Sequence, residues 1–303
     1  MPTPVALSEN HPFNADMHTP LYPQKHREYA PHPVLENRVR SYWTMEELHT
    51  SQTEQHRFFP ERLVRLCFYQ GEAYLPDLQS GHLLKPLPNM YMLGFQKEPV
   101  RFVSRGLTRL VGVELYPWTA KELMHSGEDI QNVLFKPLHA ALQELARQVM
   151  DRIHHNDDFG ALEAIEDWLL RRLTLRDIDR HAGIQAALSL YQMRGQARVH
   201  ELAEQQGVSV RHLERQFQEV VGLTPKWLSR IIRFEEAHNR LWTDPHISLT
   251  ELAFELGYAD QAHFSREFRS LTHTTPSQFA RDVQLRMQGM DLLYPQLQTP
   301  SAK

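Results

Sequence analysis

The spacing of hydrophobic residues divides the chain into a part with short apolar runs and a part with helical periodicity. Between residues 35 and 117 the runs are rich in Val, Tyr and Phe and recur between turn residues. They cover residues 39–43, 63–69, 91–95, 100–103 and 109–115. Runs of this length and composition are typical of strands. The pattern predicts a β-sandwich or barrel in this part of the chain.

The apolar period then changes to three or four residues. Residues 136–155 and 159–173 repeat leucine, isoleucine and valine at this spacing, which predicts two amphipathic helices after the sheet. The two helices could form a dimer contact or pack onto the sheet. Residues 174–183 are highly charged, and we expect the domain boundary there.

Two segments beyond this boundary resemble each other. The first contains Glu201, Leu202, Ala203, Gly207, Leu213, Arg215, Phe217, Thr224 and Pro225. The second contains Glu251, Leu252, Ala253, Gly257, Phe264, Arg266, Phe268, Thr275 and Pro276. The offset is 50 residues before the glycine and 51 after it, so one extra residue lies in the second turn.

Each copy has the pattern of a helix, a tight turn and a second helix. A glycine follows the first helix, where left-handed backbone is easiest for glycine. Ser209 and Asp260 are suitable N-caps for the second helices. Pro225 opens a long helix between the copies, and Asp244 and Pro245 end it. We therefore predict two helix-turn-helix units joined by a rigid helix.

The outward face of each second helix carries polar and basic residues opposite the apolar pair. These faces comprise Arg211, Glu214, Arg215 and Gln218 in the first unit, and Ala262, Ser265, Arg266 and Arg269 in the second. Arg, Gln and Ser can contact base edges and phosphates in a major groove. The alternatives are phosphate contact alone, a solvated surface, or a helical repeat used for protein contacts.

The segment 184–282 resembles the DNA-binding domain of the AraC/XylS family of bacterial transcription regulators. The most specific stretches are residues 257–269 and 275–279. The resemblance implies base-reading roles for Arg211, Glu214, Arg215, Gln261, Ala262, His263 and Arg266, and we add His212 to the predicted DNA contacts. One departure is His273, which stands where the family has a glycine after the second reading helix. The N-terminal half is similar, more loosely, to the β-rich sensor domain of some members.

Charge sharpens the expectation for DNA binding. The 303-residue chain has a formal net charge of −4, and from residue 181 onward Lys and Arg equal Asp and Glu in number. DNA-binding domains usually have a basic excess. Binding should therefore depend on a few placed residues rather than on a broad basic surface.

Composition restricts the remaining possibilities. No apolar run is long enough to span a bilayer, and the first residues lack the layout of a signal peptide. The single cysteine, Cys67, excludes an intrachain disulfide and a thiolate zinc cluster. We expect a cytoplasmic protein without membrane contact.

Candidate chemistry outside the repeat is sparse. The eleven histidines before residue 181 show no metal-ligand spacing, and no phosphate loop, nucleophile elbow or carboxylate pair is present. We expect no metal, no cofactor and no enzyme activity. Cys67 is expected in the core, with redox sensing as the alternative. Several aromatic side chains could line an effector pocket or form the core of the sheet: Trp43, Phe68, Tyr69, Tyr91, Phe95 and Tyr116.

The predicted fold class is α+β, with a β-rich sensor-like domain and two appended helices before an all-α double helix-turn-helix domain. The predicted divisions are a disordered tail (1–33), an effector or dimerisation domain (34–180), the DNA-binding domain (181–283) and a C-terminal tail (284–303). We expect a transcription regulator of promoter DNA, responsive to a small-molecule effector. Its possible partners are a second copy and, for an activator, RNA polymerase. The alternatives are an effector-independent protein whose first domain only dimerises, and a β-barrel enzyme fused to a DNA-binding domain.

Overall fold

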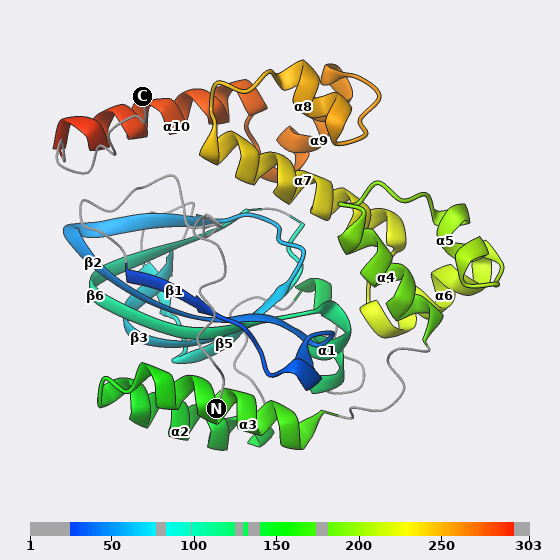
Figure 1. Cartoon of the computed structure of the whole chain (residues 1–303). Coiled ribbons are helices and arrows are strands. Elements are labelled where there is room, and N and C mark those ends of the chain that lie inside the picture. The colour runs from blue at the N-terminus through cyan, green and yellow to red at the C-terminus, as the bar shows by residue number, and fades with distance from the viewer. Residues whose placement is uncertain are drawn as a thin grey trace, which may run out of the picture.

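The computed structural model describes residues 25–76, 83–97, 99–124, 130–132, 140–173 and 181–293. A β-rich part comes first, and a helical part follows it, as Figure 1 shows. This confirms the predicted fold class. The predicted boundary around residues 174–183 falls largely outside the described residues.

The sheet is antiparallel and has six strands. Its order is β1-β2-β6-β3-β4, and β5 also pairs with β3. The strands are β1 (Lys25–Tyr29), β2 (Val39–Phe58), β3 (Val64–Pro76), β4 (Leu83–Pro86), β5 (Met90–Leu93) and β6 (Val100–Leu115). The described strands belong to one sheet whose end strands, β1 and β4, do not pair with each other, and they do not form the expected sandwich or barrel.

The alternation of side chains along the strands gives the sheet two different faces. On one face, Leu66 and Phe68 of β3 join a core that includes apolar residues of α2 (Ala140–His154) and α3 (Asp158–Arg172). On the other face, Cys67 and Tyr69 join a smaller apolar cluster. In Figure 1, α2 and α3 lie below the sheet. Packing onto the sheet is therefore one role of these helices.

Short helical segments connect the sheet to the rest of the chain. They are η1 (Pro33–Leu35), α1 (Pro117–Leu123) and η2 (Ile130–Asn132). Both α1 and η2 lie beside the helical part, and Ile130 belongs to the same core as the sheet.

The helical part follows the predicted repeat closely. It comprises α4 (Ala182–Gln192), α5 (Val199–Gln205), α6 (Val210–Val221), α7 (Pro225–Thr243), α8 (Leu249–Glu255), α9 (Gln261–Thr272) and α10 (Pro276–Leu293). The two helix-turn-helix units, α5–α6 and α8–α9, are confirmed. The turn glycines Gly207 and Gly257 have φ values of 64° and 72°.

Two tail predictions need correction. Residues 25–29, expected in a disordered tail, form β1 and pair with β2 from Lys25↔Glu46 to Tyr29↔Tyr42. The edge of β2 supplies hydrogen-bond partners that a weak local pattern does not reveal. Residues 284–293, expected in a C-terminal tail, continue α10. Residues 1–24 and 294–303 lie outside the described residues.

Candidate nucleic-acid interface and sheet cavity

The second helix of the first unit, α6, has one buried and one exposed face. Ser209 caps it, because the side-chain oxygen accepts a hydrogen bond from the backbone N–H of His212 at 3.3 Å. Leu213 and Phe217 are fully buried and fix the helix to the core. The exposed side chains on the opposite face are Arg211, Glu214, Arg215 and Gln218.

The second helix of the second unit, α9, is built in the same way. Oδ1 of Asp260 accepts from the backbone N–H of His263 at 2.6 Å, and Phe264 and Phe268 are buried. The exposed residues are Gln261, Ala262, Arg266 and Arg269, whereas His263 and Ser265 are half-buried. Both predicted caps are thus confirmed, and each unit exposes two arginines on this helix.

Some predicted reading residues are held by neighbours within their own unit. Arg215 Nη2 lies 3.1 Å from Nδ1 of His212. The Gln218 amide donates to the carbonyl of Gly222 at 3.0 Å.

In the second unit, Gln261 accepts a hydrogen bond from the Thr250 hydroxyl at 2.8 Å. The His263 ring packs edge-on against Tyr258 at 5.4 Å. The held side chains have defined positions in the free protein, which lowers the entropy lost on contact with a ligand.

Two arginines of α7, which the sequence reasoning did not identify, contact the second unit and help to position its helix α9. Arg230 lies over the Trp227 ring at 4.9 Å and pairs with Glu267 of α9. Arg233 lies over the Tyr258 ring at 4.6 Å. The spacing of Trp227 and Arg230, three residues apart on a helix, was the available signal. These contacts tie the linker helix α7 to the second unit.

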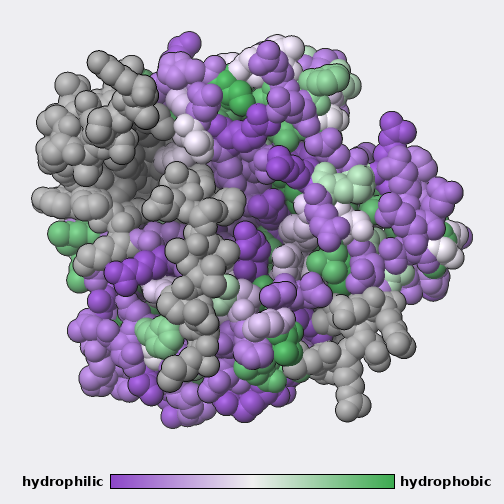
Figure 2. Space-filling model, viewed as in Figure 1, coloured by the Kyte–Doolittle hydropathy of each residue, from purple (hydrophilic) through white to green (hydrophobic). Residues whose placement is uncertain are grey.

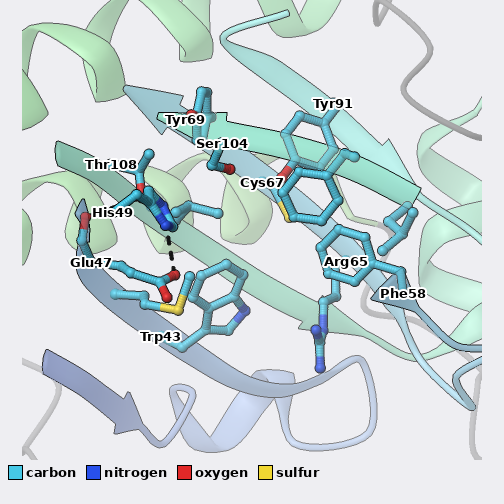
Figure 3. Close-up of a pocket in the computed structure, with 14 residues that line it drawn as sticks. Trp43, Glu47, His49, Phe58, Arg65, Cys67, Tyr69, Tyr91, Ser104 and Thr108 are labelled. Atoms are coloured by element: carbon cyan, nitrogen blue, oxygen red, sulfur yellow. Dashed lines mark hydrogen bonds and ion pairs between the residues drawn. The ribbon is translucent and has the colours of Figure 1, made fainter. Parts of the chain in front are cut away.

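The second face of the sheet contains a cavity of about 30 Å³. Its lining residues come from β2, β3, β5 and β6, and Figure 3 shows their side chains converging from these strands. Most of the wall is apolar, including Phe58, which stacks on Phe102 at 4.8 Å. A water molecule needs about 10–15 Å³ by this measure, so the cavity has room for about two.

One end of the cavity is polar. Nε2 of His49 lies 3.1 Å from Oγ1 of Thr108 and 3.9 Å from Oε2 of Glu47. All three side chains are buried. A ligand in the cavity would therefore meet hydrogen-bonding groups at this end, and elsewhere a mainly apolar wall that also includes Arg65 and Ser104.

The aromatic residues proposed for an effector pocket separate between the two faces. Trp43, Tyr69 and Tyr91 line the cavity, whereas Phe68 and Phe95 belong to the core shared with the helices. Tyr116 lies outside the cavity, stacked on Trp118 at 4.8 Å.

Cys67 is also part of the cavity wall. Burial raises the pKa of its thiol to about 12. Because the thiolate is the reactive form, the group is protonated and unreactive near neutral pH.

A metal centre is not supported by the part of the chain that the structure describes. Within those ranges, no group of three or more His, Cys, Asp or Glu side chains could hold an ion. Each helix described there is too short or too polar to cross a bilayer.

Two protein-family models match the chain. One, described as a helix-turn-helix domain, matches residues 202–282, and another, a domain of unknown function (DUF6597), matches residues 27–128. RhaS of Salmonella arizonae, an HTH-type transcriptional activator, is 36% identical over 92 residues. RhaS of Salmonella newport matches equally. Residues 202–282 of the chain therefore form a helix-turn-helix domain of the AraC/XylS type.

The RhaS match spans 30% of this chain and 30% of the relative's length. Among solved structures, ToxT from Vibrio cholerae is 13% identical with a TM-score of 0.43, over 80% of this chain and 98% of that one. The C-terminal domain of AraT from Geobacillus stearothermophilus is 25% identical with a TM-score of 0.32, over 33% and 84%. All predicted DNA contacts lie within the matched helix-turn-helix domain, residues 202–282.

Proposed function

We propose that this chain is a sequence-specific DNA-binding transcription regulator that contacts two adjacent major-groove segments. The observation that carries the proposal is the pair of capped helices, α6 and α9, each with a polar, arginine-bearing exposed face. The linker helix α7 has 19 residues, which corresponds to about 28 Å at the α-helical rise. Successive major grooves on one side of B-DNA are about 34 Å apart, a comparable distance.

Within this proposal the reading residues are those predicted from the sequence. Arg211, Arg215, Arg266 and Arg269 supply charge to phosphates or guanine edges, and Gln218 and Gln261 supply amides. Helix N-termini capped by Ser209 and Asp260 point free backbone N–H groups toward phosphates. On the face seen in Figure 2, the α4–α6 lobe at the right is mainly hydrophilic.

Replacement of Arg266 tests the proposal. The DNA site is first selected from genomic fragments with the full chain, and affinity is then measured by gel shift. Arg266→Ala should weaken specific binding by about 1–3 kcal/mol if the guanidinium pairs with a base. Arg171→Ala on α3, also exposed, is the matched control and should bind normally. Unchanged affinity and unchanged sequence preference in Arg266→Ala would contradict the assignment.

We propose further that a small molecule acting at the sheet cavity regulates the chain. The support is the combination of aromatic walls and the polar end at Glu47, His49 and Thr108. At about 30 Å³, the cavity holds a ligand larger than two waters only if side chains of its wall move aside. We propose that the stacked pair Phe58 and Phe102 does so.

A thermal-shift screen of the full chain tests effector binding, since a ligand that binds only the folded state raises Tm. A true cavity ligand should lose its shift in Ser104→Leu, which places a larger side chain in the wall. If no compound raises Tm and the protein sediments as a dimer, the result supports the alternative of an effector-independent protein in which residues 34–180 only dimerise.

The remaining parts of the proposal concern partners and location. We include a second copy of the chain and, because the curated RhaS relatives are described as activators, RNA polymerase. A cytoplasmic location follows from the proposed DNA partner. A fused enzyme would be favoured by an inward cluster of three His or Glu side chains, and the described residues hold no such metal-binding group.

A further inference from the structure

The segment that connects β2 to β3, residues 59–63, leaves the sheet, and its first residue contacts the core of the second helix-turn-helix unit. Phe59 is only 1% exposed and belongs to the aromatic core of that unit rather than to the sheet. Its ring lies 5.2 Å from His238 of α7 and 6.5 Å from Phe279 of α10. Phe279 in turn packs on Phe268 of the reading helix α9 at 5.7 Å. Two ring contacts therefore connect the sheet region to α9.

Arg62 of the same segment holds the linker helix through its backbone and its side chain. Its backbone N–H donates to Oε2 of Glu235 at 2.8 Å, and its Nε lies 3.2 Å from Oε1 of the same carboxylate. The Arg62 carbonyl accepts a hydrogen bond from the Tyr191 hydroxyl of α4. Arg62 thus joins α7 to α4 as well as to the sheet region.

A separate part of the sheet region holds the first unit. Nζ of Lys121 in α1 donates to the carbonyl of Gln218 at 3.0 Å, at the end of α6. The amide of Gln131 in η2 donates to the carbonyl of Gly222, also at 3.0 Å. The β-rich part therefore contacts both reading units at different places, in addition to the helix α7 that joins them.

We infer that Phe59 and Arg62 are positioning residues, which fix the reading helix α9 relative to α6 and so set the DNA spacing that the chain accepts. Neither residue lies on a reading face. This inference rests on the proposed DNA binding. Helix α7 packs into the core of the second unit, and Arg230 pairs with Glu267 of α9. The attachment through residues 59–63 fixes this assembly to the β-rich part, which also holds the end of α6.

The cavity and this attachment meet at one point. Phe58 lines the cavity and stacks on Phe102, whereas the next residue, Phe59, enters the helical core. A ligand that displaces Phe58 would therefore act on Phe59 through one peptide unit.

The first test compares DNA sites with altered spacing, using the full chain, the selected site, and the same site with one added base pair between its two halves. The wild type should lose about tenfold in affinity on the altered site, because one base pair shifts the second half by about 3.4 Å and 34°. Phe59→Ala should lose no more than about threefold between the two sites, whatever its affinity for the first. A merely destabilised protein would weaken on both sites equally.

Phe254 provides a matched control, because it lies in the same unit but is 82% exposed. Phe254→Ala should keep the wild-type spacing preference. Glu235→Gln breaks the ion pair with Arg62 and leaves the aromatic core in place. This variant replaces Phe59→Ala in the spacing test if Phe59→Ala does not fold. Wild-type spacing preference in both Phe59→Ala and Glu235→Gln would overturn the inference.

Backbone hydrogen exchange on the DNA-free protein supplies a second readout. In Phe59→Ala, amides of α9 and the first turns of α10 should exchange at least about tenfold faster, while those of α5 and α6 keep their rates. If the wild type selects no DNA site, the proposed function fails. Hydrogen exchange alone then tests whether Phe59 holds the second unit in place. Unchanged exchange in α9 and α10 would then overturn the inference.

Discussion

The two helix-turn-helix units share a sequence pattern but differ in where their cores belong. Leu213 and Phe217 of the first unit join one large core that also contains the sheet and helices α2 and α3. Phe264 and Phe268 of the second unit lie in a separate aromatic core. Among the described residues, the β-rich part contributes Phe59 to this core. The first unit therefore shares its hydrophobic core with the N-terminal part, whereas the second unit has a core of its own.

The units also differ on their exposed faces and at their helix ends. The first presents two arginines with a glutamate, and the second presents Arg266 and Arg269 beside small residues. After α6, Gly222 adopts left-handed backbone with φ of 78°, and after α9 the same position is His273 with φ of 63°. Repetition of a motif has preserved the backbone while the side chains diverged.

The largest expected effect separates the two cores. Phe268→Ala should destabilise the second unit by about 3–5 kcal/mol, as for other buried phenylalanines. Because its core is separate, the second unit should unfold before the rest in urea, which segment-resolved hydrogen exchange can detect. Phe217→Ala should instead lower the stability of the first unit and the sheet together. A single shared transition in both variants would contradict two cores.

A pH dependence of intermediate size is expected in the second unit. His238 is buried among Phe59, Phe234 and Phe279, and burial lowers its pKa from 6.5 to about 4. Between these pH values the unfolded chain binds more protons, so stability falls as the pH falls from about 6.5 to 4. The loss at the low end is roughly 3 kcal/mol.

The variant His238→Phe removes this ionisation and keeps an aromatic ring in the core. Burial also lowers the pKa of His26 in β1 to about 4, so the sheet should keep its own dependence. Urea unfolding at pH 7 and pH 5 measures the difference. An equal pH dependence of the second unit in wild type and His238→Phe would refute the assignment.

The smallest expected effect concerns the helix ends. A residue with a Cβ in left-handed backbone costs about 1–2 kcal/mol, and the greater freedom of glycine in the unfolded chain offsets part of the gain. His273→Gly should therefore stabilise the second unit by about 0.5–1 kcal/mol.

Gly222→Ala provides the comparison in the first unit. A Cβ there would lie 2.7 Å from Cγ2 of Ile130, in addition to the left-handed strain. It should destabilise more than His273→Gly stabilises. Denaturant midpoints measure the stability of both variants. A loss of stability in His273→Gly would disprove backbone strain at His273.

The sequence predicted best where structure depends on neighbours along the chain. Both helix pairs, the caps Ser209 and Asp260, and the long helix from Pro225 follow from local patterns, and the structure has them all. The sheet was anticipated as strands but not as a single open sheet, because strand order depends on distant pairing. β1 was missed for the same reason.

Contacts between distant segments were out of reach of the sequence. Nothing local shows that Phe59 leaves the sheet for a helical core, or that Trp43 and Phe68 occupy opposite faces. The exposure of Arg211 and Arg266 was predicted correctly from helical period alone. Their contact with bases stays a prediction, because it depends on a partner and not on the fold.

The adjacent residues Phe58 and Phe59 lie in two different environments, and this limits how sequences with this architecture can diverge. One residue belongs to the cavity wall and the next to the helical core, so an insertion or deletion where β2 passes into its connection to β3 would move one of them to the wrong side. Side chains elsewhere in the wall can change with the ligand. Across related chains, we therefore expect the composition of the cavity to drift while the length of this connection stays constant.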